Sequence, residues 1–236
     1  STDQISNISL QGPNSRKILE KFIFTSPTQP SISELQWFRF SICRIEDLNG
    51  IPLIISRTGY TGELGYEIWC SPSDASKVWD KVFEAGKDDG LIPAGFGALD
   101  LLRIEAGLIL YGNEFDGQVD PFEAGVGFTV PLKTKTDDFV GKESLKKRKE
   151  NPQKKLVGLE LISKENANHG DCVHIGRAQV GIITSGCISP VLNKNIALCR
   201  IDIGHSNVGT EVEVGKIDGE KKRITAKIVE FPHFDP

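Results

Sequence analysis

The sequence has 236 residues and a nearly balanced charge, with 28 Lys or Arg against 32 Asp or Glu and a formal net charge of −4. A hydrophobic fraction of 39% and a charged fraction of 25% are typical of a globular protein, with room for one large domain or two modest ones. No apolar run approaches the about 18 residues that a membrane-spanning helix needs, so the sequence excludes a membrane span. The slight acidity argues against nucleic-acid binding, which depends on neutralising phosphates.

The cysteines are odd in number and show no Cys-x-x-Cys spacing, which disfavours a disulfide framework and a zinc site and suits a reducing compartment. They are Cys43, Cys70, Cys172, Cys187 and Cys199. The N-terminus lacks the profile of a signal peptide, so we expect a cytoplasmic protein, or a mitochondrial-matrix one in a eukaryote. The absence of Met fits removal of an initiator before Ser1 and also fits a chain that starts partway through a larger protein.

The first part of the chain predicts an α+β region that ends near Val130. Alternating or β-branched runs predict strands, and apolar residues at helical spacing predict helices, with Asp74 as an N-cap and Asn49-Gly50 as a hairpin turn. The expected strands are 5–10, 38–42, 52–56 and 66–69, and the expected helices are 15–24, 74–86 and 97–110.

The residue pattern changes in the second part of the chain. A basic helix over 141–149 is closed by Asn151-Pro152, and short β-rich runs separated by Gly and Asn follow it. These runs are 156–161, 179–184, 196–201, 211–214 and 224–229. They predict a small closed or sandwiched β-domain, with a domain boundary at about residue 150 that separates 1–150 from 151–236.

The densest motif is Arg57-Thr-Gly-Tyr-Thr-Gly-Glu-Leu-Gly-Tyr-Glu-Ile-Trp69. Its three glycines allow tight turns and close approach of the backbone to a ligand. A carboxylate in such a loop, Glu63 or Glu67, could accept two hydrogen bonds from a planar pair of N–H groups, which is the pattern that a pterin ring presents. Taken alone, a motif of this kind is more often a solvated hairpin with two surface acids, because glycine-rich turns are common.

Other candidate sites are less specific. Asp100 and Arg103 lie three residues apart on one helix face and can form a structural ion pair. His169 and His174 are expected to be solvated, and no metal site is predicted. Dinucleotide, phosphate-loop and nucleophile-elbow motifs are absent from the sequence. The basic residues among positions 142–155 form either a solvated helix face or a docking patch for an acidic partner.

Taken in order, several segments resemble the aminomethyltransferase family, whose type member is the T-protein of the glycine cleavage system. The matching stretches are Leu10-Gln-Gly-Pro13, Arg57-Thr-Gly-Tyr-Thr-Gly-Glu63 with Gly65-Tyr-Glu67, Leu102-Arg-Ile-Glu-Ala-Gly107 with Leu110-Tyr-Gly112, Asp120-Pro-Phe-Glu-Ala-Gly125, Phe139-Val-Gly-Lys142, Leu156-Val-Gly158, and Gly181-Ile-Ile-Thr-Ser-Gly186 with Ser189-Pro190. The resemblance covers essentially the whole chain.

The resemblance implies a folate-binding α+β domain, here partial, followed by a C-terminal β-barrel domain. It implies transfer of a one-carbon unit to tetrahydrofolate, as the T-protein does with the aminomethyl group on the lipoyl arm of the H-protein. Glu67 resembles the carboxylate that grips the pterin, and Glu63, Tyr60, Tyr111 and Arg103 resemble residues of the folate cleft. An acidic H-protein is the implied partner, with Lys146, Lys147, Arg148 and Lys149 as its docking residues.

Two departures from the family stand out. The segment that precedes this region in the family, and that carries its catalytic Asp, has no counterpart here, so the catalytic acid is expected outside this chain and the chain alone is expected to be inactive. The Arg that T-proteins carry before the helix Asp is Leu99. Leu99 favours an alternative, a tetrahydrofolate-dependent demethylase of a methylated amine or sulfonium compound.

Two further alternatives stay open. Phe231-Pro-His-Phe-Asp-Pro236 resembles the closing segment of dimethylglycine- and sarcosine-type oxidoreductases, although this chain has no flavin domain. Folate-binding proteins that maintain iron–sulfur proteins without catalysis have the same fold. Their Lys-Gly-Cys-Tyr signature is absent here, where the corresponding region contains no Cys.

Overall fold

The computed structural model describes residues 3–216 and 222–235. The chain forms two compact units, one up to Leu99 and the other from Asp100 to Asp235, and each has its own hydrophobic core. The division falls within the helix α3 (Phe96–Glu105). The domain boundary predicted at about residue 150 stays a prediction.

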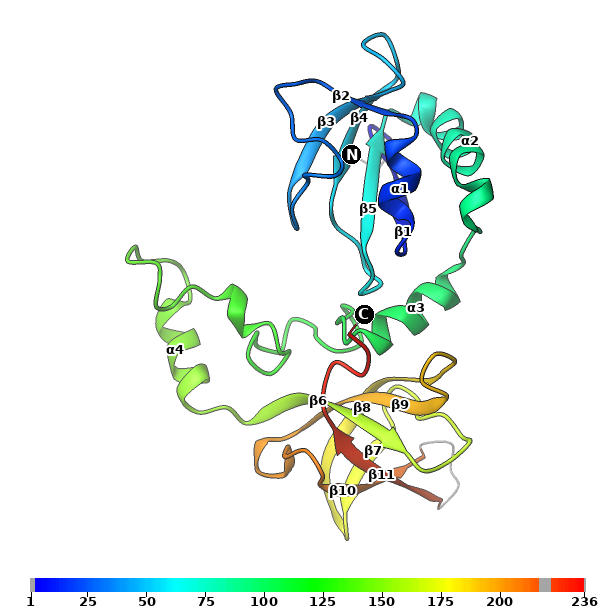
Figure 1. The fold of residues 1–236 in the computed structure, drawn as a ribbon. Coiled ribbons are helices and arrows are strands. Elements are labelled where there is room, and N and C mark those ends of the chain that lie inside the picture. Colours follow the sequence, from blue (N-terminus) through cyan, green and yellow to red (C-terminus); the bar gives the residue numbers. More distant parts are fainter. Residues whose placement is uncertain (1–2, 217–221, 236) are drawn as a thin grey trace. The chain divides into compact units, whose positions relative to one another are not determined.

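The first unit is an antiparallel five-stranded sheet in the order β1-β5-β4-β3-β2, with helices on one side of it (Figure 1). The predicted α+β class is confirmed. Its elements are β1 (Ser6–Gln11), α1 (Ser15–Glu20), β2 (Ile23–Thr25), β3 (Phe40–Ile45), β4 (Pro52–Ser56), β5 (Gly65–Cys70) and α2 (Ala75–Gly86), with short 3-10 helices at Pro72–Asp74 and Lys87–Asp89.

Alternation along β4 and β5 separates the two faces of this sheet. Ile55 and Ile68 are fully buried in the core that α1 and α2 share with the sheet. Ile54, Glu67 and Trp69 belong to the opposite face, because neighbouring residues of a strand point to opposite sides. The sheet face turned away from the helices therefore carries the predicted pterin-binding carboxylate.

Two local predictions in this unit need correction. The helix expected over 15–24 ends at Glu20, because Ile23–Thr25 pairs with β3 as an edge strand, where its β-branched residues are favourable. Asp74 occupies the N-cap position of α2, but its side chain makes no capping bond. Its backbone is helical rather than extended, and its carboxylate lies 3.4 Å from the Lys77 ammonium.

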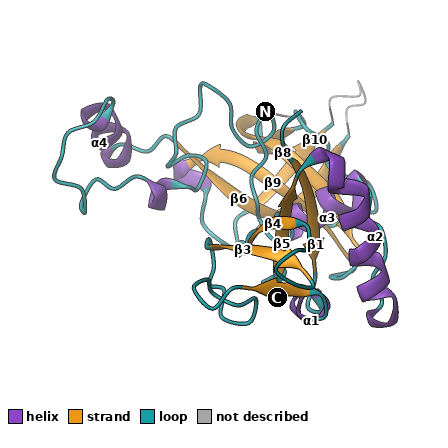
Figure 2. Cartoon of the chain, turned by 90° about the horizontal axis from the view of Figure 1, so that it is seen from above, coloured by secondary structure: helices purple, strands orange, loops and turns teal. Residues whose placement is uncertain are grey.

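The second unit contains the end of α3, the basic helix α4 (Lys142–Glu150) and a closed six-stranded barrel in the order β10-β11-β6-β9-β8-β7. The predicted closed β-domain is confirmed. The barrel strands, orange in Figure 2, are β6 (Lys154–Leu161), β7 (Cys172–Ile175), β8 (Ala178–Ser189), β9 (Lys194–Asp202), β10 (Glu211–Gly215) and β11 (Arg223–Val229). Short 3-10 helices lie at Gly127–Thr129 and Ile203–His205.

Strand β7 was not predicted, because four residues that include Cys172 and His174 give too little alternation to read as a strand. It pairs with both β8 and β10 and so closes the barrel. Figures 1 and 2 show α4 at the far end of an excursion from the barrel. No helix in the described part of the chain is long and apolar enough to cross a membrane.

Helix α3 ends earlier than the predicted residue 110. Gly107 adopts φ +68°, Leu108 N–H bonds the Arg103 carbonyl at 2.8 Å, and Gly107 N–H bonds the Ile104 carbonyl at 3.1 Å. This is the paired bonding of a Schellman cap, which needs a left-handed residue after the helix and is most easily made by glycine. The apolar residues that follow belong to a loop rather than to another helical turn.

Candidate functional site

The loop between β4 and β5 contains the glycine-rich motif and is organised by the side chain of Gln11. The Gln11 amide donates to the Thr58 carbonyl at 3.3 Å, and its carbonyl oxygen accepts from the Thr61 hydroxyl at 3.2 Å. A Cβ at Gly59 or Gly65 would lie 2.0 or 1.8 Å from the Gln11 Oε1 atom. Two of the three glycines thus make room for Gln11, whereas the sequence interpretation assigned that space to a ligand.

Glu67 lies in β5 directly after this loop and is half-buried. Its backbone register places it opposite Ser56 of β4 on one side and opposite Ser9 of β1 on the other. The Thr58 hydroxyl donates a hydrogen bond to the Glu67 Oε2 atom. The carboxylate is therefore oriented by its own loop rather than left to move freely in solvent.

The other predicted residues of this unit, Tyr60 and Glu63, lie in the same loop and are half-buried. The Glu63 backbone N–H bonds the Thr61 hydroxyl at 3.3 Å. No hydrogen bond or ion pair to the Glu63 carboxylate is found among the described residues. One loop and the adjoining strand thus carry Tyr60, Glu63 and Glu67, and the Glu67 carboxylate is held by a side chain of the same loop.

Arg103, in the second unit, is 1% exposed and its donors are directed at protein groups. It bonds Asp100 at 2.7 Å, which confirms the predicted ion pair of the helix face. It also bonds Glu114 at 2.7 Å, the Ser185 hydroxyl at 2.7 Å and the Leu108 carbonyl at 3.3 Å. A contact between Arg103 and folate stays a prediction.

Glu114 connects this cluster to the loop that holds Tyr111. It is fully buried, and its carboxylate accepts from the Leu110 backbone N–H at 2.8 Å and from the Ser185 hydroxyl at 2.5 Å. Tyr111 itself is 69% exposed and meets Phe115 edge-on, with ring centroids 5.5 Å apart. The buried cluster fixes the base of the loop while the Tyr111 ring remains accessible.

Four residues that contribute to these sites were not predicted from the sequence: Gln11, Thr58, Glu114 and Ser185. Each lies inside or beside a stretch that resembles the family, so a signal was present. Their pairings were not accessible, because Ser185 and Glu114 are 71 residues apart in the chain. Only the closed barrel brings them together.

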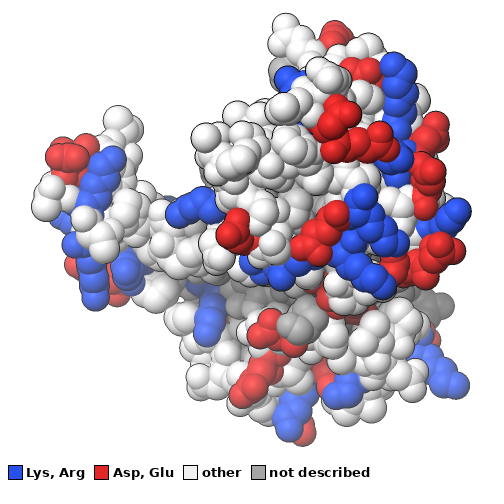
Figure 3. Space-filling model, turned by 45° about the horizontal axis from the view of Figure 1, so that its top comes forward, with Lys and Arg blue, Asp and Glu red and all other residues white. Residues whose placement is uncertain are grey.

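The basic helix α4 carries both signs of charge, which Figure 3 shows as interleaved blue and red side chains. Lys146 pairs with Glu143 at 2.6 Å, and the Lys149 ammonium lies 5.8 Å from the centroid of the Phe122 ring. Lys147 and Arg148 are exposed, and the described residues include no ion-pair partner for them. These two cations are the best candidates for an interaction with an acidic partner.

Two cysteine thiols that could act as nucleophiles, those of Cys187 and Cys199, are buried. Burial, and secondarily the Glu105 charge, raises the pKa of the Cys187 thiol to about 12. Burial likewise raises the pKa of Cys199 to about 12. Neither thiol is a nucleophile at neutral pH, because the thiolate is the reactive form. Among the described residues, no group of His, Cys, Asp and Glu side chains has the arrangement of a metal site.

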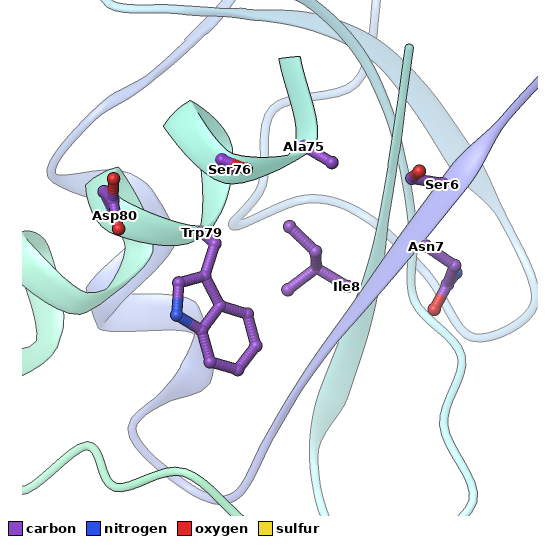
Figure 4. Close-up of a pocket in the computed structure, with 7 residues that line it drawn as sticks. All are labelled: Ser6, Asn7, Ile8, Ala75, Ser76, Trp79 and Asp80. Carbon is purple, nitrogen blue, oxygen red and sulfur yellow. The ribbon is translucent and has the colours of Figure 1, made fainter. Parts of the chain in front are cut away.

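A shallow pocket of about 450 Å³ lies between β1 and α2. Figure 4 shows Ile8 and Trp79 pointing toward each other across it, with Asp80 as its charged residue. Trp79 is 46% exposed and packs on Phe83 at 4.8 Å. The pocket holds no convergent set of polar groups, so it has the character of a surface groove rather than a reaction site.

Comparison with known families accounts for both units. Residues 1–134 match the family model of the GCVT N-terminal domain, and residues 154–235 match that of the glycine cleavage T-protein C-terminal barrel domain. The chain belongs to the glycine cleavage T-protein family. Members of this family use tetrahydrofolate, and T-proteins act together with an H-protein.

The relatives of this chain have different names. The chain is 58% identical over 236 residues to a trimethylamine-oxide aldolase of Ruegeria pomeroyi, covering all of this chain and 30% of that protein. It is 43% identical over 235 residues to an aminomethyltransferase of Anoxybacillus flavithermus, covering 99% of this chain and 61% of the relative. The chain thus spans less than two thirds of the length of these relatives.

A solved structure shares the fold. The crystal structure of glycine cleavage system aminomethyltransferase T from Bartonella henselae superposes with a TM-score of 0.81 at 24% identity, covering 98% of this chain and 60% of that one. At this identity the likeness supports the fold alone.

Proposed function

We propose that this chain is the folate-binding and barrel part of an aminomethyltransferase-like enzyme, which transfers a one-carbon unit to tetrahydrofolate. The observation that carries the proposal is the placement of Glu67 on the sheet face turned away from the helices, with one oxygen bonded to Thr58. A pterin presents an amino group beside a ring N–H, and a carboxylate can accept from both. The acceptor chemistry of Glu67 therefore fits the ligand that the family uses.

Two of the remaining predicted residues would extend the binding surface around Glu67, because Tyr60 and Glu63 lie in the same glycine-rich loop. Contacts of Tyr111 and Arg103 with the folate stay predictions from the family resemblance. Tetrahydrofolate, when bound, supplies the nitrogens that accept the one-carbon unit. No residue of this chain is assigned a proton-transfer role. The chain spans less than two thirds of the length of the relatives named above, and the 236 residues alone are expected to be inactive.

A second candidate function is folate-dependent demethylation of a methylated amine. Two observations favour it: Leu99 stands where T-proteins carry an Arg, and a relative with 58% identity is named trimethylamine-oxide aldolase. Removing dimethylamine from trimethylamine oxide leaves one carbon, two hydrogens and one oxygen, which is formaldehyde. A folate site of this type would hold the acceptor for that carbon.

The H-protein is proposed as the partner only for the aminomethyltransferase reaction. An acidic carrier would be attracted to the exposed Lys147 and Arg148 of α4, with Lys146 and Lys149 beside them. A demethylase that receives its carbon from a small amine has no need of this interaction. The role of α4 therefore distinguishes the two functions.

Calorimetric titration of the 236-residue chain with tetrahydrofolate tests the shared part of both proposals. We expect weak binding, because the 236 residues cover 61% of an aminomethyltransferase relative, and tighter binding once the rest is supplied from that relative. Low-micromolar affinity of the chain alone would show that the 236 residues form a complete folate cleft, against this expectation. In the completed protein, ammonia release from aminomethyl-loaded H-protein would support the first function, and methylenetetrahydrofolate formed with trimethylamine oxide as the donor would support the second.

A further inference from the structure

A line of polar side chains crosses the sheet face turned away from α1 and α2 and ends at Glu67. The Trp69 indole N–H donates to the Ser56 hydroxyl at 3.2 Å. The Ser56 and Thr58 hydroxyl oxygens are 2.8 Å apart, and the Thr58 hydroxyl bonds the Glu67 carboxylate. Each member is half-buried, so these bonds are partly shielded from water.

We call this series of hydrogen bonds, from Trp69 through Ser56 and Thr58 to Glu67, the relay. The chemistry of its two end groups fixes the direction of every hydrogen bond in it. An indole N–H can only donate, and an ionised carboxylate can only accept. The single proton of Thr58 is used by Glu67, so the bond between the hydroxyls must be donated by Ser56. Ser56 in turn accepts from Trp69, and the hydroxyls have one consistent orientation.

The strands impose this arrangement. Ser56 and Glu67 are directly opposite in the β4–β5 pair, and Trp69 is two residues further along β5, on the same face. Thr58 follows Arg57 at the start of the glycine-rich loop, where the Gln11 amide donates to the Thr58 carbonyl at 3.3 Å. Both the backbone and the side chain of Thr58 are therefore fixed before a ligand arrives.

We propose that Thr58 is a positioning residue that makes Glu67 selective for a ligand with two adjacent N–H donors. This inference rests on the proposed folate function and adds a specificity determinant to it. The relay occupies the Oε2 side of the carboxylate and directs its dipoles toward the negative charge, which holds the carboxylate in one orientation as an acceptor. The Oε1 atom and the remaining lone pairs stay available to a planar donor pair.

The relay predicts discrimination between two similar heterocycles. A pterin offers an amino group beside a ring N–H, whereas lumazine has a carbonyl oxygen in place of the amino group. That oxygen would face a carboxylate that the relay keeps as an acceptor. A site that pairs with a donor rejects the analogue lacking it, because its own polar group is left unpaired.

The relay itself is tested by NMR of the indole N–H groups of the 236-residue chain. Trp37 and Trp79 lie outside the relay and serve as internal references, and Trp→Phe substitutions assign the three signals. We expect Thr58→Val and Glu67→Gln to move the Trp69 signal and Thr58→Ser to restore it. Thr25→Val, at the far edge of the same sheet, is the matched control. A Trp69 signal that Thr58→Val leaves unmoved would overturn the relay.

The role in binding is tested by titrating the same chain with tetrahydrofolate, pterin and lumazine to millimolar concentrations, with the Trp69 signal as the readout. We expect Thr58→Val to weaken tetrahydrofolate binding about threefold to tenfold, and Thr58→Ser to recover it. We expect pterin to bind and lumazine not to bind. Equal affinity of wild type and Thr58→Val, or equal binding of pterin and lumazine, would overturn the positioning role. Tetrahydrofolate that bound with no dependence on Glu67 would instead contradict the proposed function.

Discussion

Ser185 of β8 donates a 2.5 Å hydrogen bond to Glu114, which lies 71 residues earlier in the chain and is fully buried. The same hydroxyl oxygen accepts from the Arg103 guanidinium at 2.7 Å. One barrel side chain thus completes a buried ion pair between a helix and the loop that carries Tyr111. Burying paired charges costs solvation free energy, which further hydrogen bonds offset.

Removing this hydroxyl is expected to destabilise the second unit. Ser185→Ala leaves a buried guanidinium N–H and a carboxylate oxygen short of a partner, and we expect the free energy of unfolding to fall by about 2–4 kcal/mol. Urea denaturation followed by circular dichroism measures the change. Ser206→Ala, which removes a local surface hydroxyl, is the control and should change stability by less than about 0.5 kcal/mol. Equal midpoints for the two variants would contradict a structural role for the cluster.

The glycine-rich loop offers a test of the Gln11 contact. Gly65→Ala would place a Cβ 1.8 Å from the Gln11 Oε1 atom, so the Gln11 side chain must move and release the Thr58 carbonyl and the Thr61 hydroxyl. We expect a lower melting temperature for Gly65→Ala. In the Gln11→Ala background the same substitution should cost less, because the obstructing atoms are gone. A cost that is equal in the two backgrounds would show that Gly65 is needed for another reason.

The C-terminal segment is expected to make stability depend on pH. Burial lowers the pKa of His233, whose Nε2 atom lies 3.2 Å from the Ala197 carbonyl. The unfolded chain binds a proton at about pH 6.5, and the folded chain binds it only at lower pH. Stability is therefore full above about pH 6.5 and falls as the pH drops toward the lowered pKa, by at most about 1.4 kcal/mol per pH unit.

His233→Gln removes this proton linkage. Urea midpoints at pH 7.5 and 5.5 should differ less in the variant than in the wild type. His205→Gln is the control, because His205 is exposed. A pH dependence that His233→Gln leaves unchanged would assign the acid sensitivity to other groups.

The sequence predicted those helices and strands that are indicated by the residue pattern of the segment itself. Pro52–Ser56 was expected as a strand and is β4, because its alternation and β-branched residues require no distant partner. The edge strand β2 was missed, because Ile23–Thr25 continues a helical spacing and becomes a strand only by pairing with β3. The same limit applied to the candidate site, where Arg103 was found and its partner Ser185 was not.

We expect the positive charges of α4 to increase the rate at which the protein associates with an acidic carrier. Lys147→Ala with Arg148→Ala removes two exposed cations that have no ion-pair partner among the described residues. Association of the completed protein with H-protein should slow, and its dependence on salt should flatten, because steering by charge is screened by ions. Lys194→Ala with Glu160→Ala removes a mutually paired couple on the barrel, at 2.8 Å, and is the charge-neutral control. If the first variant associates at the wild-type rate at low salt, the basic helix is only a solvated face.

Glu67→Gln tests the residue on which the proposed function depends most. The substitution keeps the shape of the side chain but presents an amide donor or a neutral carbonyl to a ligand that needs a charged acceptor for two donors. Charge-assisted bonds contribute about 1.5–3 kcal/mol each, so in the completed protein the affinity for tetrahydrofolate should fall about tenfold to a few hundredfold. The melting temperature should hardly change, because the backbone pairing of β5 with β1 and β4 is untouched. Glu143→Gln, at an exposed carboxylate of α4 with no proposed role in folate binding, is the matched control. If Glu67→Gln binds tetrahydrofolate as tightly as the parent protein, the carboxylate does not grip the pterin, and Glu63 becomes the residue to test.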